Sequence, residues 1–239
     1  MAKFGSIAFA RESATTSSGV TGIWGDNYHM AYPEEPLSKF LNDLAARTPT
    51  PGGGSTSALV GALGLGLASM AALYTTENEK YKSVEETVIK LDADFSALRT
   101  KFVTGVESDI QAFHAYSEAR KLPRNTPEEK AARSKKMAEL NEAATQIPED
   151  ILADAGEGLR LVEELARVVN PNMAGDVAAA AYFLEASARG AGIQIVSNCA
   201  VDDKEGMNAA RRDRVRTAIK DCQAARERID TTVAKMMIK

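Results

Sequence analysis

Hydrophobic residues along most of this chain recur every three to four positions, which is the spacing of amphipathic helices. Breaks that contain proline, glycine or capping residues divide this pattern into separate helices, and the expected N-cap residues include Ser55, Ser83 and Thr126. We expect the helices over residues 37–44, 55–76, 83–121, 126–147, 148–170 and 175–198, and from about 202–205 to the C-terminus. At Pro148 the pattern predicts that a helix either starts or kinks. No segment alternates apolar and polar residues for long enough to predict a strand.

These helices predict a single all-α domain of about six to seven helices arranged as a bundle, over residues 36–239. Alanine, with 40 of the 239 residues, favours the same fold class. Residues 1–35 show no sustained period and are expected to form a poorly structured N-terminal extension. Three aromatic residues there, Trp24, Tyr28 and Tyr32, indicate that part of the extension packs against another surface.

Two rows of seven-residue steps define the buried side of the helix expected over residues 83–121. The rows contain Val84, Leu91, Leu98, Gly105 and Ala112, and Val88, Phe95, Phe102, Asp109 and Tyr116. Asp109 is therefore expected to face inward, beside the small residues Gly105 and Ala112. A carboxylate in an apolar interior is costly unless it is paired or hydrogen-bonded. The pattern leaves two interpretations open, a structural ion pair or a functional group with a raised pKa.

Three other features carry candidate chemistry. Asn198 lies on the inward row of the helix 175–198, and Asp176 lies in its first turn, where a carboxylate also caps a helix or complements its dipole. The run 52–55 (GGGS) exposes backbone N–H groups that can hold a carboxylate or phosphate, although no Walker lysine follows it. Rows of small residues predict that helices 55–76 and 175–198 form the central packed pair.

Composition excludes several classes of function. The chain has 29 Lys and Arg against 33 Asp and Glu, so it lacks the basic character of a nucleic-acid-binding protein, and its short basic runs are expected to be solvated faces. Cys199, Cys222 and two histidines predict neither a metal site nor a disulfide framework. The longest apolar run, 58–74, is short for a membrane span, and no signal peptide is visible. We expect a cytoplasmic protein with no membrane partner.

The run 48–55 (TPTPGGGS) resembles the opening signature of the formiminotetrahydrofolate cyclodeaminase / methenyltetrahydrofolate cyclohydrolase family. The likeness extends over residues 37–235 and continues, in the family's order, through 58–64, 68–70, Lys80, Tyr81, Asp109, Ala112, Phe113, 122–126, 170–176 and Asn198. The resemblance implies an all-helical homodimer that acts on one-carbon units carried by tetrahydrofolate. It implies no metal and no tightly bound cofactor, with the tetrahydrofolate derivative as substrate.

The activity that the resemblance favours is that of a methenyltetrahydrofolate cyclohydrolase, which converts 5,10-methenyltetrahydrofolate to 10-formyltetrahydrofolate. The reason is architectural, because the chain shows no transferase domain beside the helical one. The first alternative is a formiminotetrahydrofolate cyclodeaminase, which releases ammonia. The second is a diverged helical dimer that binds a folate or another ligand without catalysis.

The resemblance also implies the roles of individual residues. Asp109 is expected to act as the base, Asp176 to orient substrate or water, and Lys80 to donate a proton or hold the folate carboxylates. The expected substrate-binding residues are Pro51, Gly52, Gly53, Gly54, Ser55, Tyr81, Asn172 and Asn198. The chain departs from the family pattern at Asn78, Glu79, Gly175 and Gln194, which reduces the positive and polar lining and motivates the non-catalytic alternative.

Overall fold

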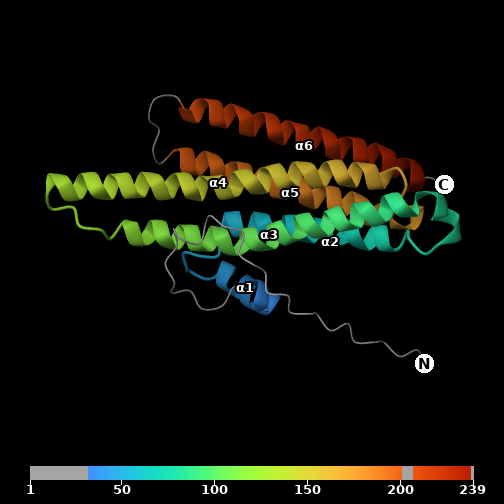
Figure 1. Ribbon diagram of the computed structural model, residues 1–239, viewed down its shortest axis with the longest axis horizontal. Helices are drawn as coiled ribbons and strands as arrows, with labels where there is room; N and C mark the ends of the chain where they lie inside the picture. The colour runs from blue at the N-terminus through green and yellow to red at the C-terminus, as the bar shows by residue number, and fades with distance from the viewer. Residues whose placement is uncertain (1–31, 201–206, 238–239) are drawn as a thin grey trace.

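The computed structural model describes residues 32–200 and 207–237, and every regular element in these two ranges is a helix (Figure 1). The α-helices are α1 (Leu37–Ala45), α2 (Gly53–Leu73), α3 (Glu85–Ala119), α4 (Pro127–Ala166), α5 (Ala174–Cys199) and α6 (Met207–Met237). Among the described residues there are also three short 3-10 helices: η1 (Tyr32–Glu34) before α1, η2 (Glu79–Val84) before α3, and η3 (Pro171–Met173) before α5. The all-α bundle is thereby confirmed. Trp24 and Tyr28, like residues 1–31 as a whole, lie outside the described ranges.

The five long helices lie lengthwise along the molecule, and the short α1 packs outside them (Figure 1). The helices α2 and α5 form the expected central pair and run antiparallel. A side chain added at Gly53 would meet Gln194, and one added at Gly64 would lie 3.0 Å from the backbone oxygen of Ala180. Small residues therefore set the close approach of these two helices, as the pattern predicts.

Helix boundaries confirm some of the predicted caps and correct others. At α4, Thr126 caps the helix as predicted, because its Oγ1 accepts the N–H of Glu129 at 3.2 Å. The N-cap of α2 is Gly52 and not Ser55, and α3 begins at Glu85 without a cap from Ser83, because η2 precedes it.

No new helix starts at Pro148, which lies inside the continuous helix α4. A proline inside a helix removes one backbone hydrogen bond. The Pro148 side chain is buried, as are Ile151 and Leu152 after it, so packing against the bundle holds α4 together at this point. Of the two alternatives predicted at Pro148, the start of a new helix was wrong, because the proline acts on the local backbone whereas the packing around it involves distant segments.

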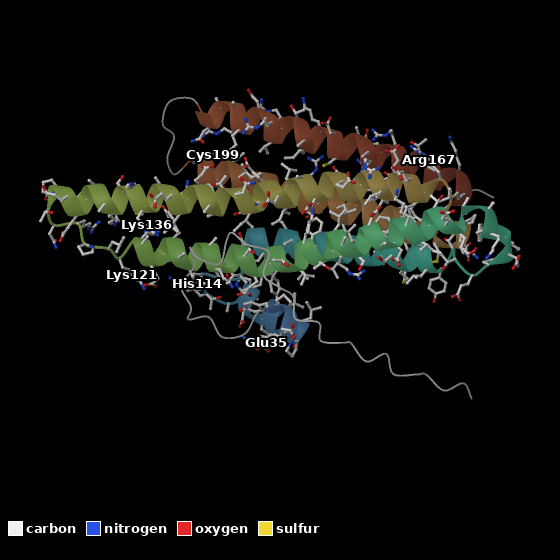
Figure 2. All side chains as sticks on the ribbon, in the orientation of Figure 1. Glu35, His114, Lys121, Lys136, Arg167 and Cys199 are labelled. Atoms are coloured by element: carbon white, nitrogen blue, oxygen red, sulfur yellow. The ribbon has the colours of Figure 1, made fainter. Side chains whose placement is uncertain are left out.

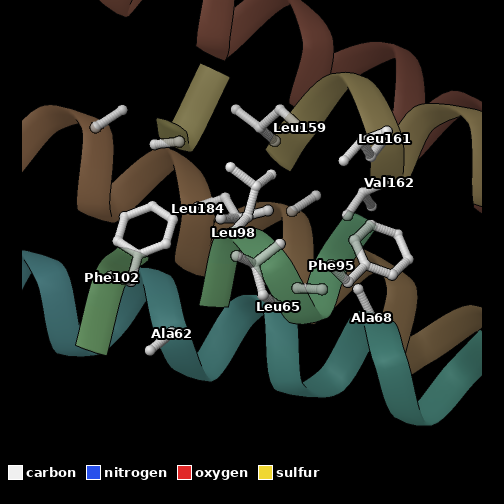
Figure 3. Packing of buried hydrophobic residues seen from close by; sticks show 14 of the residues in the cluster. Ala62, Leu65, Ala68, Phe95, Leu98, Phe102, Leu159, Leu161, Val162 and Leu184 are labelled. Carbon is white, nitrogen blue, oxygen red and sulfur yellow. The ribbon is translucent and has the colours of Figure 1, made fainter. Parts of the chain in front are cut away.

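The core lies where the inward row of α3 meets α2, α4 and α5 (Figure 3). Its largest fully buried side chains include Phe95, Phe102, Leu65, Leu159 and Leu184. The two phenylalanines belong to the predicted inward rows of α3, which the structure thus confirms. An added side chain at Gly61 would lie 2.4 Å from the Phe102 ring, so that glycine makes room for the ring.

Phe102→Ala is expected to lower the free energy of unfolding by about 3–5 kcal/mol, because it removes a ring that is 1% exposed and leaves a cavity. Urea unfolding followed by circular dichroism measures this loss. Val103→Ala, on the solvent side of the same helix, is the control and is expected to cost less than about 1 kcal/mol. Equal losses for the two variants would contradict the assignment of this core.

One helix, α2, is long and apolar enough to cross a membrane by length and composition alone, and 56% of its apolar window is buried inside the bundle. Core helices of soluble proteins pass the same test. Other side chains of α2 are apolar and lie on the surface, among them Leu63 and Leu73. This uncovered side continues onto α5 through Phe183, which lies beside Gly64, and Ile193.

Candidate active site

The first turn of α2 meets the middle of α3 at Asp109. The N-cap residue, Gly52, has no side chain to accept the free N–H groups of this turn. The Ser55 hydroxyl oxygen accepts the Gly52 N–H at 2.9 Å, and the Ser55 N–H is donated to Asp109 Oδ2 at 2.7 Å. Asp109, which lies 54 residues after Ser55 in the sequence, therefore acts as the capping side chain of α2. Its carboxyl group lies at the positive end of the helix dipole.

Gly54 makes room for the carboxylate. A Cβ at this position would lie 2.1 Å from Asp109 Oδ1, 2.5 Å from Cγ and 2.8 Å from Oδ2. No real Cβ atom tolerates such contacts, so any other residue would move the carboxyl group. The family resemblance implied only substrate binding for Gly54, and the structure gives this glycine a second role, which is to leave room for the Asp109 carboxyl group.

Burial raises the pKa of Asp109 above its ordinary value of 3.8. Hydrogen bonds from the backbone N–H and the hydroxyl of Ser55 act in the opposite direction and offset part of this effect. No Lys, Arg or His contributes to the shift. Asp109 is therefore a partly buried carboxyl group without an ion-pair partner in residues 32–200 and 207–237, which contradicts the internal ion pair that the sequence had left open.

Two further polar side chains lie at this end of α2. The His114 Nε2 and the Thr50 Oγ1 are hydrogen-bonded at 3.0 Å, next to the cis Thr50–Pro51 peptide bond. The Gln194 amide lies against Gly53, where an added Cβ would be 2.4 Å from its Nε2. Neither His114 nor Gln194 was among the predicted site residues. Gln194 had been noted as a departure from the family pattern, which was the available signal.

Asn198 lies at the same end of the bundle but contacts α4. Its Nδ2 donates to the backbone oxygen of Ala144 at 3.5 Å, and its own backbone oxygen accepts from Asn141 at 3.2 Å. Gln194 lies one helical turn before it on α5 and faces α2 instead. Of the predicted substrate-binding residues, the structure thus brings together residues 51–55 with Asp109, and places Asn198 behind them.

The remaining predicted site residues lie at the opposite end of α2. The Tyr81 hydroxyl donates to Asn170 Oδ1 at 3.3 Å, and the same oxygen accepts the Asn172 N–H at 3.1 Å. Asn170 is bound in turn to Thr75, just after the C-terminus of α2. Lys80 is exposed beside this group, and Asp176 begins α5 there. Since α2 has 21 residues, about 30 Å separates the two groups within one chain.

No group of three or more His, Cys, Asp or Glu side chains in residues 32–200 and 207–237 is arranged to hold a metal ion. Cys199 and Cys222 are both buried free thiols, and burial raises the pKa of Cys222 to about 11. Neither thiol is therefore a ready nucleophile. At this end of α2, Asp109 and His114 are ionisable side chains that the structure places close to the glycine turn.

The chain is similar to known proteins in both sequence and fold. The chain is 33% identical to the methenyltetrahydrofolate cyclohydrolase of Methylorubrum extorquens over 83% of its own length and 96% of the relative. It is 33% identical to the formimidoyltransferase-cyclodeaminase of Mus musculus over 68% of its length, but covers only 30% of that longer protein. The fold matches the crystal structure of formiminotetrahydrofolate cyclodeaminase from Thermotoga maritima, with a TM-score of 0.76 and 22% identity over 86% of this chain and 98% of that one.

A family model described as formiminotransferase-cyclodeaminase matches residues 36–221. This range contains both groups of predicted site residues, and it begins just before α1. The match spans well over half of the chain, and the alignment with the relative from Methylorubrum extorquens covers 83% of this chain at 33% identity. The chain belongs to the formiminotransferase-cyclodeaminase family.

Proposed function

We propose that this protein is a methenyltetrahydrofolate cyclohydrolase that opens 5,10-methenyltetrahydrofolate to 10-formyltetrahydrofolate by hydrolysis of a C–N bond, without a metal. The observation that carries the proposal is the Asp109 carboxyl group, which is partly buried, has no ion-pair partner among the described residues, and accepts the Ser55 N–H at 2.7 Å beside the space that Gly54 leaves. The similarity to a cyclohydrolase of nearly the same length supports this reaction over the alternatives. A cytoplasmic location is part of the proposal.

The chemistry fits a buried carboxylate. The methenyl carbon of the substrate lies in a cationic amidinium, so a nearby carboxylate attracts it and opposes its charge. Water adds to this carbon and gives a proton to Asp109, which acts as general base. The adduct then breaks its bond to N5, which takes up a proton as it leaves, and the formyl group stays on N10. One water is consumed, and no oxidant or reductant is needed.

Cyclodeamination of the 5-formimino form is the second candidate, and the similarity to cyclodeaminase domains supports it. It closes the same ring from the other side, because N10 attacks the formimino carbon and ammonia leaves. An absorbance assay distinguishes the reactions. Loss of the methenyl chromophore above the spontaneous rate supports the cyclohydrolase, and its gain from 5-formiminotetrahydrofolate with ammonia release supports the cyclodeaminase. If the folded protein accelerated neither reaction, both candidate functions would be excluded.

We also propose that the active form is a homodimer that packs through the uncovered apolar side of α2 and α5. Leu63 and Ile193 are 51% and 63% exposed there, and Phe183 lies between the two helices beside Gly64. Large exposed apolar surfaces of this kind mark association sites. A two-fold axis through the middle of α2 would set the two α2 helices antiparallel. Lys80 of the partner subunit would then approach Asp109, which unites the two separated groups of predicted residues.

Leu63→Glu is expected to shift the protein from dimer to monomer at micromolar concentration, because it places a charge in an apolar interface. Sedimentation velocity measures the change in mass. Ile89→Glu is the control, since Ile89 is 57% exposed but belongs to α3, which is not part of the proposed α2–α5 surface, and its variant is expected to stay dimeric. A wild-type protein that sediments as a monomer at all concentrations would reject the dimer without rejecting the reaction.

A further inference from the structure

The end of α3 and the start of α4 form a hairpin that projects beyond the other helices (Figure 1). The helix α2 covers α3 only as far as Asp109, where α2 begins, and α3 continues to Ala119. Four basic side chains, Arg120, Lys121, Arg124 and Arg133, line a hollow of about 560 Å³ at the tip of this hairpin. No Asp or Glu lines it.

Most of these basic groups have no acidic partner. Lys121 pairs with Glu118, and both side chains are about 70% exposed, so the pair is weak. Arg133 donates to the backbone oxygen of Arg120 at 3.2 Å, and neither Arg120 nor Arg124 binds a carboxylate of the described residues. By contrast, three arginines elsewhere in the described residues, Arg160, Arg211 and Arg226, each bind at least two carboxylates.

The hairpin is basic although the whole chain is acidic. Residues 118–136 contain seven Lys and Arg against three Glu, whereas the chain has a net charge of −4. One of these acids, Glu129, is occupied by the N–H groups of Asn125 and Thr126 at the start of α4. The positive potential of the hollow is therefore available to a ligand. Arginine guanidinium groups bind carboxylates and phosphates through paired hydrogen bonds, so the fitting ligand is an anion that carries such groups, and the folate of the proposed function carries carboxylates.

The hollow and the candidate active site lie along the same face of α3. Arg120 follows Asp109 by eleven residues, which is three helical turns, so both lie on the same face of α3 and about 16 Å apart. Tyr116, half-buried, lies between them on that face. In Figure 2, the labelled Lys121 lies further along the chain's hairpin than the labelled His114, toward the tip. A ligand bound along this face would meet a carboxylate, an aromatic ring and then arginines.

We propose that the hollow binds the carboxylate-bearing glutamyl tail of the folate whose one-carbon group lies at Asp109. This inference rests on the proposed function. A tetrahydrofolate has its reacting ring at one end, an aromatic ring in the middle and one or more glutamyl carboxylates at the other end, which is the order of partners along α3. The hollow at the hairpin, rather than Lys80 or the glycine turn, thus takes the tail within one chain.

The test compares methenyltetrahydrofolate with one and with five γ-linked glutamates as substrates of the full-length protein. The KM of the pentaglutamate is expected to be about tenfold lower than that of the monoglutamate, with equal kcat. The ratio of the two KM values is expected to shrink as the salt concentration is raised. Arg124→Glu is expected to bring the ratio below about twofold. Lys220→Glu, the same charge change on an exposed position of α6, is the control and is expected to leave it unchanged.

Equal KM values for the two substrates in a wild-type protein that turns both over would overturn this inference and leave the proposed function intact. No turnover of either would overturn the function, and the tail is then tested directly by calorimetry with free penta-γ-glutamate. Binding that Arg124→Glu abolishes and Lys220→Glu preserves supports the hollow as a polycarboxylate site. Absence of binding, or equal displacement by inorganic pyrophosphate at the same concentration, rejects it.

Discussion

Asp109→Asn is expected to lower kcat for methenyltetrahydrofolate by about 100- to 10,000-fold, the usual contribution of a general base. The amide has the shape of the carboxyl group and its oxygen still accepts the Ser55 N–H, so the α2–α3 contact is retained. What it loses is the negative charge beside the cationic carbon and the ability to take the proton. Loss of the methenyl chromophore, corrected for the spontaneous rate, measures the effect.

The control is Asp94→Asn, the same substitution on the same helix, about four turns from the site, which is expected to keep wild-type kcat. Near-wild-type activity of Asp109→Asn in a folded protein would reject Asp109 as the base. Loss of activity together with unfolding would assign Asp109 a structural role, so urea unfolding accompanies the assay.

The wild-type protein and Asp109→Asn are expected to differ in how their rate and stability change with pH. Because burial raises the pKa of Asp109 above 3.8, the wild-type rate is expected to fall, as pH decreases, at a pH above the ordinary aspartate range. Asp109→Asn is expected to lack this fall. Folding favours the protonated form of such a group, so wild-type stability decreases as pH rises from 3.8 through the raised pKa. The Asn variant is therefore expected to be at least as stable at pH 7 and to lose this advantage below about pH 4.

Periodicity predicted the fold well because helices in this chain are specified locally. The inward rows of α3, the close pairing of α2 with α5 and the Thr126 cap all follow from short-range patterns, and the structure confirms each. Pro148 shows the limit of such patterns. Its effect on the backbone is local, but the packing that holds α4 together around it comes from distant segments.

The candidate site was predicted less completely, because its parts meet only in three dimensions. Asp109 was found as a polar residue on an apolar row, but its contact with Ser55 spans 54 positions of the sequence, and no periodicity reports it. The same applies to Gln194 against Gly53. The order of the family's motifs along the chain also suggested that Lys80 shares a site with Asp109, whereas α2 separates them by its whole length within one chain.

Gly54→Ala is the sharpest test of the geometry itself, because it leaves every ionisable group in place. A methyl group 2.1 Å from Asp109 Oδ1 forces the carboxyl group to move. A displacement of about 1 Å in a catalytic group costs on the order of 100-fold in rate, so we expect at least that loss in kcat/KM. The Ser55 N–H would also lose its acceptor, so a loss of about 1–3 kcal/mol in unfolding free energy is expected beside it.

Gly156→Ala provides the matched control on α4, where the added methyl would lie 3.7 Å from the Cys222 sulfur, an ordinary contact. It is expected to keep full activity and to gain up to about 1 kcal/mol in stability, because alanine favours a helix interior over glycine. The two variants make the same chemical change and differ only in what the new carbon meets. If Gly54→Ala retained wild-type kcat/KM, the carboxyl group beside it would not be the group that acts on the substrate, and the position of Asp109 would reflect only the capping of α2.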